Sequence, residues 1–380
     1  MEHTTDNAKV GSSWVLDLEA LKSCDIILSR DGSWLSKTIR WGSGGEYSHA
    51  MLYLPLSIIH ARKPGVFSYN PQRLFSNGEE DFCVLRFAGL NDEQQKKIEE
   101  FARSKVGSLY SIREATSVVL NRDAHSAKVP DKQFCSRFVA QAFEAAKISL
   151  LPNSCYCAPG DFVKSSKLIR VDGATRPATE IDVRRINSFD FVTSNREHTF
   201  AWLSEARKYS GDIATVNDAV RYVVNDRVAD EKTARAMAES GYLEDWKADK
   251  VAHEYRYDAK LLYMLIKMGK TDIMLETRAL TEYAERIFLE LIDIRALARR
   301  SQSKVVKLLA CLYENLLRDV CERMQVLSQV MSICGYIIPG VCKLVFLYTK
   351  VLDGSEMVKR EEVAEDQEEI VKEDVRPYLK

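Results

Sequence analysis

The sequence has 380 residues, of which 46% are hydrophobic and 29% charged, and its formal net charge is -1. This length suits two domains, and the composition is that of a soluble globular protein with enough apolar residues to build a core. A nearly neutral chain has no basic field of the kind that attracts nucleic acid. We therefore expect no nucleic-acid partner.

The nine cysteines are scattered along the chain and do not have the spacing of a disulfide framework. This pattern is typical of reduced thiols in a reducing compartment. Residues 1–11 are polar and lack the apolar stretch of a signal peptide. The sequence therefore predicts a cytoplasmic protein, or one delivered without a recognisable signal peptide.

One short cysteine pattern, Cys155-Tyr156-Cys157, is a weak candidate for a metal site. Neither a second cysteine pair nor a histidine at ligand spacing completes it. We therefore expect no metal and no other cofactor.

The first half of the chain alternates between strand and helix patterns. Short apolar runs predict strands at 25–28, 49–54, 57–61, 66–69 and 82–87, with Pro55 in the turn after the second. Asn91 is the candidate N-cap of a helix that stops at Gly107. Another apolar stripe at helical spacing predicts a helix from about Cys135 to Lys147.

The second half reads as helical. Little Gly or Pro occurs between His198 and Leu352, which predicts a bundle of about five to seven helices. The uncharged run 326–342 is broken by Pro339 and Gly340, and Lys343 follows. A membrane-spanning helix needs about 20 apolar residues, so a buried helix pair is favoured, and peripheral membrane contact stays open. The acidic tail from Asp353 predicts a solvated helix or disorder.

Three side chains form the candidate chemistry. Cys135 starts an apolar-periodic helix, where the helix dipole favours a thiolate. His49 and His60 lie in consecutive predicted strands on one face. They are directly opposite if the turn is centred between residues 54 and 55, and diagonal if the centre shifts by one. One imidazole can then act as base while the other holds its tautomer. Taken singly, each residue is more often ordinary core or surface.

Six short motifs follow one another along the first half of the chain, at 21–28, 47–53, 58–61, 102–110, 134–136 and 158–162. In the order and spacing of these motifs the chain resembles the circularly permuted NlpC/P60 branch of the papain-like superfamily, the YiiX/YebB-like and lecithin:retinol acyltransferase-like proteins. The resemblance covers about residues 21–170. Two positions depart from the family pattern: Cys24 stands where glycine is usual, and Arg137 replaces an acidic residue.

The resemblance implies an α+β fold: a permuted papain-like domain with an antiparallel sheet and a nucleophile helix, followed by an all-α domain. The expected divisions are an N-terminal extension at 1–20, the papain-like domain at 21–190, the helical bundle at 195–352 and the acidic tail at 353–380.

The resemblance also assigns roles. Cys135 would be the nucleophile, His49 the general base that later acts as acid, and His60 the group that orients His49. Backbone N–H groups at the helix start would hold the oxyanion, because a helix start leaves them unpaired. The candidate substrate-binding residues are Tyr47, Gly44, Gly45 and Ser136. Ordinary packing explains Tyr47 equally well, and a plain loop explains the two glycines.

The favoured function is a cysteine hydrolase of peptidase or amidase type, attacking an amide, thioester or ester through an acyl-enzyme. A lipid-directed acyltransferase or lipase could use the same three residues, with membrane contact by the C-terminal helices. A catalytically idle module, with a protein partner bound by the helical half, is the third reading. The expected substrates are accordingly peptides, acylated molecules or lipids.

Overall fold

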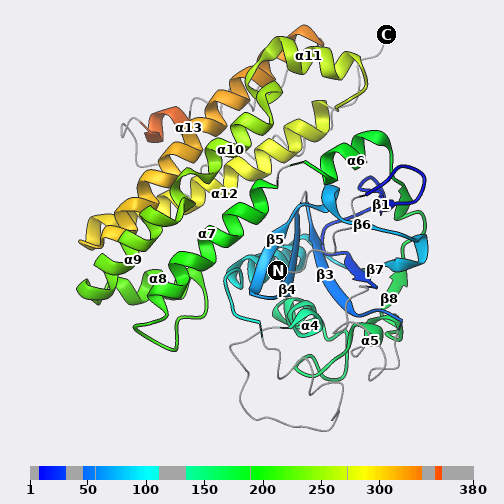
Figure 1. Ribbon diagram of the computed structural model, residues 1–380, viewed down its shortest axis with the longest axis horizontal. Coiled ribbons are helices and arrows are strands. Elements are labelled where there is room, and N and C mark those ends of the chain that lie inside the picture. Colours follow the sequence, from blue (N-terminus) through cyan, green and yellow to red (C-terminus); the bar gives the residue numbers. More distant parts are fainter. Residues whose placement is uncertain are drawn as a thin grey trace. The chain divides into compact units, whose positions relative to one another are not determined.

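The fold of the chain is α+β, as predicted, with antiparallel sheets in the N-terminal part and helices in the C-terminal part (Figure 1). It comes from a computed structural model that describes residues 8–30, 46–55, 57–110, 134–188, 190–271, 273–335 and 347–352. The chain divides into two compact units, residues 1–222 and 223–380.

The main element of the first unit is a six-stranded antiparallel sheet in the order β5-β4-β3-β2-β7-β8. The five predicted strands are all present in it, with bounds close to those expected. A second, three-stranded sheet in the order β6-β1-β9 was not predicted. The strands of the large sheet are β2 Ile26–Ser29, β3 His49–Leu54, β4 Ser57–Arg62, β5 Gly65–Tyr69, β7 Phe82–Phe87 and β8 Leu168–Arg170. The small sheet contains β1 Trp14–Leu16, β6 Phe75–Ser76 and β9 Thr175–Pro177.

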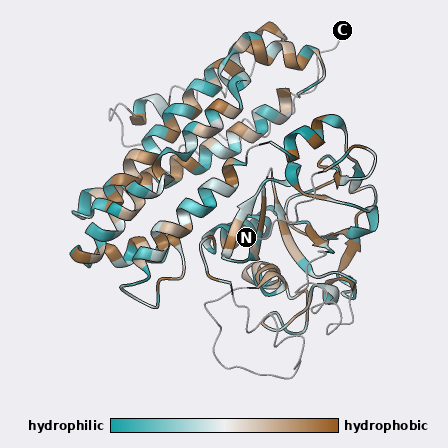
Figure 2. Cartoon of the chain, in the orientation of Figure 1, coloured by the Kyte–Doolittle hydropathy of each residue, from teal (hydrophilic) through white to brown (hydrophobic). Residues whose placement is uncertain are grey.

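The two faces of the large sheet are both buried, which explains why its strands are continuous apolar runs (Figure 2). On one face, Leu28 and Leu52 pack with residues of α2 Asp92–Ser104 and α4 Cys135–Ala145. On the other face, Met51 packs in a separate apolar cluster. The alternation of side chains along each strand therefore divides the core into two layers.

The two predicted helices of this unit begin where expected. Asn91 caps α2 by accepting a hydrogen bond from the N–H of Gln94 at 2.9 Å. Gly107, with a φ of +92°, follows the end of that helix. Helix α4 begins at Cys135 and has no side-chain cap at its N-cap residue, Phe134. Its first N–H groups are therefore available to other acceptors.

Cys24 adopts a backbone conformation that favours glycine. Its φ is +68°, in the left-handed region, and its side chain is buried. A residue other than glycine pays about 1–2 kcal/mol of steric strain in this region. Cys24 therefore occupies a position where the backbone conformation itself favours the glycine that is usual in the family pattern.

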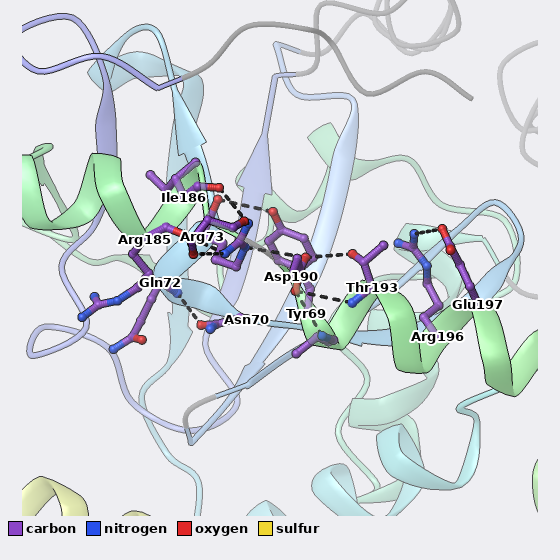
Figure 3. Close-up of polar contacts among 12 residues, drawn as sticks. Tyr69, Asn70, Gln72, Arg73, Arg185, Ile186, Asp190, Thr193, Arg196 and Glu197 are labelled. Atoms are coloured by element: carbon purple, nitrogen blue, oxygen red, sulfur yellow. Dashed lines mark hydrogen bonds and ion pairs between the residues drawn. The ribbon is translucent and has the colours of Figure 1, made fainter. Parts of the chain in front are cut away.

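Helix α7 Phe191–Ala206 belongs to the first unit and is joined to it by Arg73 (Figure 3). The Arg73 guanidinium donates to the carbonyl oxygens of Arg185 and Ile186 at 2.6 and 2.7 Å, at the end of α6 Glu180–Ile186. Its Nε also lies 3.6 Å from Asp190, which caps α7. One side chain thus fixes the end of one helix and the start of the next. Two further helices of this unit are α5 Pro159–Val163 and α8 Val216–Val223, which ends at the boundary.

The second unit is helical, as the scarcity of Gly and Pro predicted. Its longest helices, α12 Ile273–Arg300 and α13 Lys304–Ile333, pack along one another. Buried Asp230 caps α13 by accepting from the Ser303 hydroxyl and the Val305 N–H, at 2.5 and 3.0 Å. The remaining helices are α9 Arg227–Ser240, α10 Asp245–Ala252 and α11 Ala259–Lys267.

The apolar run 326–342 is only partly described, because α13 ends at Ile333 and residues 336–346 lie outside the described residues, as does the acidic tail. Among the described helices, none has the length and apolar character that a membrane crossing requires.

Candidate active site

The two histidines meet beyond the end of a β-ladder. Among the described residues, the ladder of β3 and β4 pairs residues 52–54 with residues 59–57 and goes no further toward the start of β3. This register makes His49 and His60 diagonal neighbours, the second of the two predicted arrangements. The Nε2 of His49 lies 2.8 Å from the Nδ1 of His60, so a side-chain hydrogen bond joins the strands where the ladder has ended.

Cys135 lies at this opening. It is the first residue of α4, which packs against β3 and β4. The N–H of Tyr53 donates to the carbonyl oxygen of Asp25, on the β2 side of β3. N–H groups alternate sides along a strand, so the N–H of Ala50 faces β4. That N–H interacts with the Cys135 sulfur. The thiol is therefore held at the residue next to His49.

The Cys135 thiol is a neutral group at rest. Burial raises its pKa above the ordinary value, and the side chain is 4% exposed. The backbone N–H groups of Ala50, Ser136 and Cys135 act in the opposite direction. The helix start thus stabilises the thiolate as predicted, but burial is the larger effect. A base is needed to remove the proton when the thiol reacts.

His60 is neutral too. Burial, then the neighbouring His49 and the cations of Arg62 and Arg196, hold its pKa well below the usual value. Because one nitrogen of His49 faces His60, only its Nδ1 remains to take a proton from a thiol. The resulting imidazolium would donate its Nε2–H to the Nδ1 of neutral His60. The family resemblance implies this orienting role for His60, and the role stays a prediction.

Helix α7 supplies a residue to this site that the sequence did not indicate. The Arg196 guanidinium lies over the ring of Phe67, 4.6 Å from its centroid. The ring of Phe67 lies 4.5 Å from that of His60 in an edge arrangement. Arg196, Phe67 and His60 thus form a stack of residues that are far apart in the sequence. Such a contact produces no periodic pattern from which it could be predicted.

Tyr110 is a second neighbour that received no role from the sequence. Burial and the proximity of Cys135 raise the pKa of its phenol. Its backbone N–H donates to the carbonyl oxygen of Pro64 at 3.1 Å, which ties it to the turn between β4 and β5. The motif 102–110 ends on this tyrosine, so the signal that could have found it was present.

The four predicted substrate-binding residues are placed differently. Tyr47 is buried in the core and interacts with Cys83. Ser136 is buried, and its hydroxyl donates to the carbonyl oxygen of Cys157 at 2.6 Å. Gly44 and Gly45 lie outside the described residues. These assignments stay predictions, and the geometry gives Tyr47 and Ser136 packing contacts within the fold.

Arg137 is fully buried beside the nucleophile position. Its guanidinium lies 4.3 Å from the ring centroid of Phe134, and its Nε donates to the carbonyl oxygen of Cys155 at 2.9 Å. Arg137 therefore holds the 155–157 segment against the start of α4. The cysteines of that segment are free thiols, and within the described residues no group of three or more His, Cys, Asp or Glu could hold a metal ion.

The depressed pKa of His60 predicts a loss of stability in acid. In the unfolded chain, His60 binds a proton below about pH 6.5, whereas in the folded chain it binds one only at a lower pH. The stability contributed by neutral His60 is thus complete above that pH and is lost as pH falls toward the folded pKa. The free energy of unfolding should fall by up to about 1.4 kcal/mol per pH unit from this group. In urea unfolding, the free energy of unfolding of His60→Gln should fall less steeply with decreasing pH than that of wild type. The free energy of His253→Gln should fall as steeply as that of wild type. Parallel declines in all three proteins would contradict the prediction.

Comparison with known proteins gives a likeness to solved structures and nothing else. No family model matches the chain, and no curated protein matches it. Among solved structures, the chain is similar to the metalloprotein yiiX from Escherichia coli O157:H7 (DUF1105), at a TM-score of 0.27 and 19% identity. The alignment covers 40% of this chain and 96% of that chain. At this TM-score the likeness carries no argument about function, and membership of the superfamily is a proposal.

Proposed function

We propose that the chain is a cysteine-dependent hydrolase of the permuted papain-like superfamily, which attacks an amide, thioester or ester carbonyl. The observation that carries the proposal is the arrangement of one thiol and two imidazoles. The His49–His60 hydrogen bond of 2.8 Å lies next to Ala50, whose N–H contacts the Cys135 sulfur. The order and spacing of the sequence motifs support the same reading.

The chemistry proceeds through an acyl-enzyme. The Nδ1 of His49 takes the thiol proton as the Cys135 sulfur attacks the carbonyl carbon, and the carbonyl oxygen becomes an oxyanion. The uncapped N–H groups at the start of α4 donate to this oxyanion. The His49 imidazolium then protonates the leaving group as the bond to it breaks. Water, deprotonated by His49, hydrolyses the thioester and restores the thiol.

His60 holds His49 throughout this sequence. Its neutral ring accepts the His49 Nε2–H and stabilises the imidazolium without taking the proton, because its own pKa is depressed. The ring of Phe67, 4.5 Å from that of His60 between centroids, is part of the burial that depresses the pKa of His60. The mechanism requires only a carbonyl and a leaving group, so amides, thioesters and esters are all possible substrates.

The proposal is tested with an activated aryl ester, p-nitrophenyl acetate, which acylates a reactive thiol whatever the natural substrate. Wild type should release one equivalent of nitrophenol in a burst, and mass spectrometry should find the acetyl group on Cys135. Cys135→Ala should lose the burst. The matched control is Cys311→Ala, which removes an exposed thiol of the second unit and should keep it.

The competing interpretation is an inactive binding module with a core thiol. A buried cysteine without a base reacts more slowly than an exposed one. Acetylation of Cys311 ahead of Cys135 in wild type would therefore support the inactive module and reject the hydrolase.

A further inference from the structure

Helix α11 presents an apolar stripe to solvent. Leu261, Met264 and Met268 are 42%, 47% and 58% exposed, whereas Leu262 of the same helix is 2% exposed. At 100° per residue, the three exposed side chains fall within about 60° of one another around the helix axis. The helix therefore has two apolar faces, and only the one with Leu262 packs inside the second unit.

Lysines lie along one side of this stripe. Lys260 and Lys267 are exposed and follow Met264 within about 60° around the axis, and exposed Lys270 lies just beyond the helix. In the part of the chain that the structure describes, none of these three lysines forms an ion pair. No acidic residue occurs from Ala259 to Lys270. Asp258, at the helix start, accepts from the N–H groups of Lys260 and Leu261 and caps the helix.

The stripe differs from the other exposed apolar side chains. Among the described residues, the large apolar side chains exposed elsewhere include Val228, Val163 and Ile169, which lie on separate elements. Single exposed apolar residues are normal on a protein surface. Three on one face of α11 and its C-cap residue, beside lysines that form no ion pair within the described residues, make an amphipathic surface.

We propose that the exposed face of α11 docks on an anionic phospholipid surface. The apolar side chains of Leu261, Met264 and Met268 enter the interface between headgroups and acyl chains, with the helix lying in the plane of the surface. The ammonium groups of Lys260, Lys267 and Lys270 pair with lipid phosphates and carboxylates. Charge complementarity selects this partner, because none of the three lysines forms an ion pair with a described residue. The Lys267 ammonium lies over the ring of Tyr263, 5.5 Å from its centroid, and no carboxylate neutralises it there. Lysine stems reach past apolar surface while keeping their charge in water.

Two physical contributions set the expected affinity. Transfer of exposed apolar surface from water is worth about 25 cal/mol per Å², and each lysine near an anionic surface adds about 1 kcal/mol. The electrostatic part is weakened by salt, because the Debye length shortens. Binding should therefore need anionic lipid, decline with added salt, and fail when either the stripe or the lysines are changed.

The test is flotation of the full-length chain with vesicles of phosphatidylcholine alone or mixed with phosphatidylserine. Wild type should float with the mixed vesicles and stay at the bottom with phosphatidylcholine alone. The triple variant Leu261→Ser, Met264→Ser, Met268→Ser should bind at least about tenfold more weakly. Lys260→Glu with Lys267→Glu should lose the dependence on phosphatidylserine. The matched control is Val228→Ser, which alters a 64% exposed side chain of α9 and should float like wild type.

All variants change exposed positions, so their thermal unfolding should match wild type within a few degrees. Wild type that fails to float with the mixed vesicles overturns the proposal, as does an α11 triple variant that floats equally well. Light scattering supplies a further check. If wild type forms a dimer that the triple variant does not form, and neither floats, the face belongs to a second copy of the chain and the lipid proposal is wrong.

Discussion

Exchanging His49 for glutamine is expected to slow acetylation of Cys135 by about 10²–10⁴-fold near neutral pH. The reason is the raised pKa of the buried thiol: without a base, almost no thiolate is present. Glutamine keeps a polar side chain beside His60 but cannot take the proton. Stopped-flow release of nitrophenol from p-nitrophenyl acetate measures the acylation rate.

The pH profile separates loss of a base from loss of the fold. In His49→Gln, acylation should recover only above the ordinary thiol range of about pH 8.5, where hydroxide ionises Cys135 directly. In His60→Gln the loss should be smaller, because the amide oxygen can still accept the His49 Nε2–H. His253→Gln, in the second unit, should react like wild type. Wild-type rates in His49→Gln would remove this histidine from the mechanism.

The sequence was a good guide to elements and a partial guide to the site. Strand β3 has the predicted bounds, because its apolar run ends at the Pro55 turn. The helix that begins at Cys135 also starts where predicted. Period-2 alternation put His49 and His60 on one face and reduced their arrangement to two registers, one of which is present. These features depend on local patterns, which a single sequence contains.

The rest depends on contacts between distant segments. The Ala50 N–H interacts with Cys135 where the β3–β4 ladder has ended, and this interaction depends on the packing of α4 against β3 and β4. The Arg196–Phe67 stack depends on how α7 packs on the sheet. The helix start, a local effect, predicted a lowered pKa for Cys135, whereas burial, a tertiary effect, is larger and raises that pKa. Local reasoning identified the reacting groups but not their protonation state.

Gly65→Ala is expected to destabilise the first unit by about 3 kcal/mol or more. A Cβ at Gly65 would overlap the carbonyl oxygen of Ser108 and lie 2.8 Å from the ring of Phe200 on α7. The Ser108 oxygen cannot retreat freely, because it accepts from the N–H of Val66 at 2.8 Å. The β4–β5 hairpin, which carries His60, would have to move away from α7. Urea unfolding measures the free-energy loss, and acylation of Cys135 should weaken with it.

Gly211 provides the matched control for that substitution. No atom lies within 4 Å of a Cβ built there, and its φ is outside the left-handed region. Gly211→Ala should therefore change the free energy of unfolding by less than about 0.5 kcal/mol. The difference between the two variants separates the close approach of Ser108 and Phe200 to Gly65 from the general effect of a glycine replacement. Equal stabilities for Gly65→Ala and Gly211→Ala would contradict the close packing of Ser108 and of Phe200 in α7 against the β4–β5 hairpin.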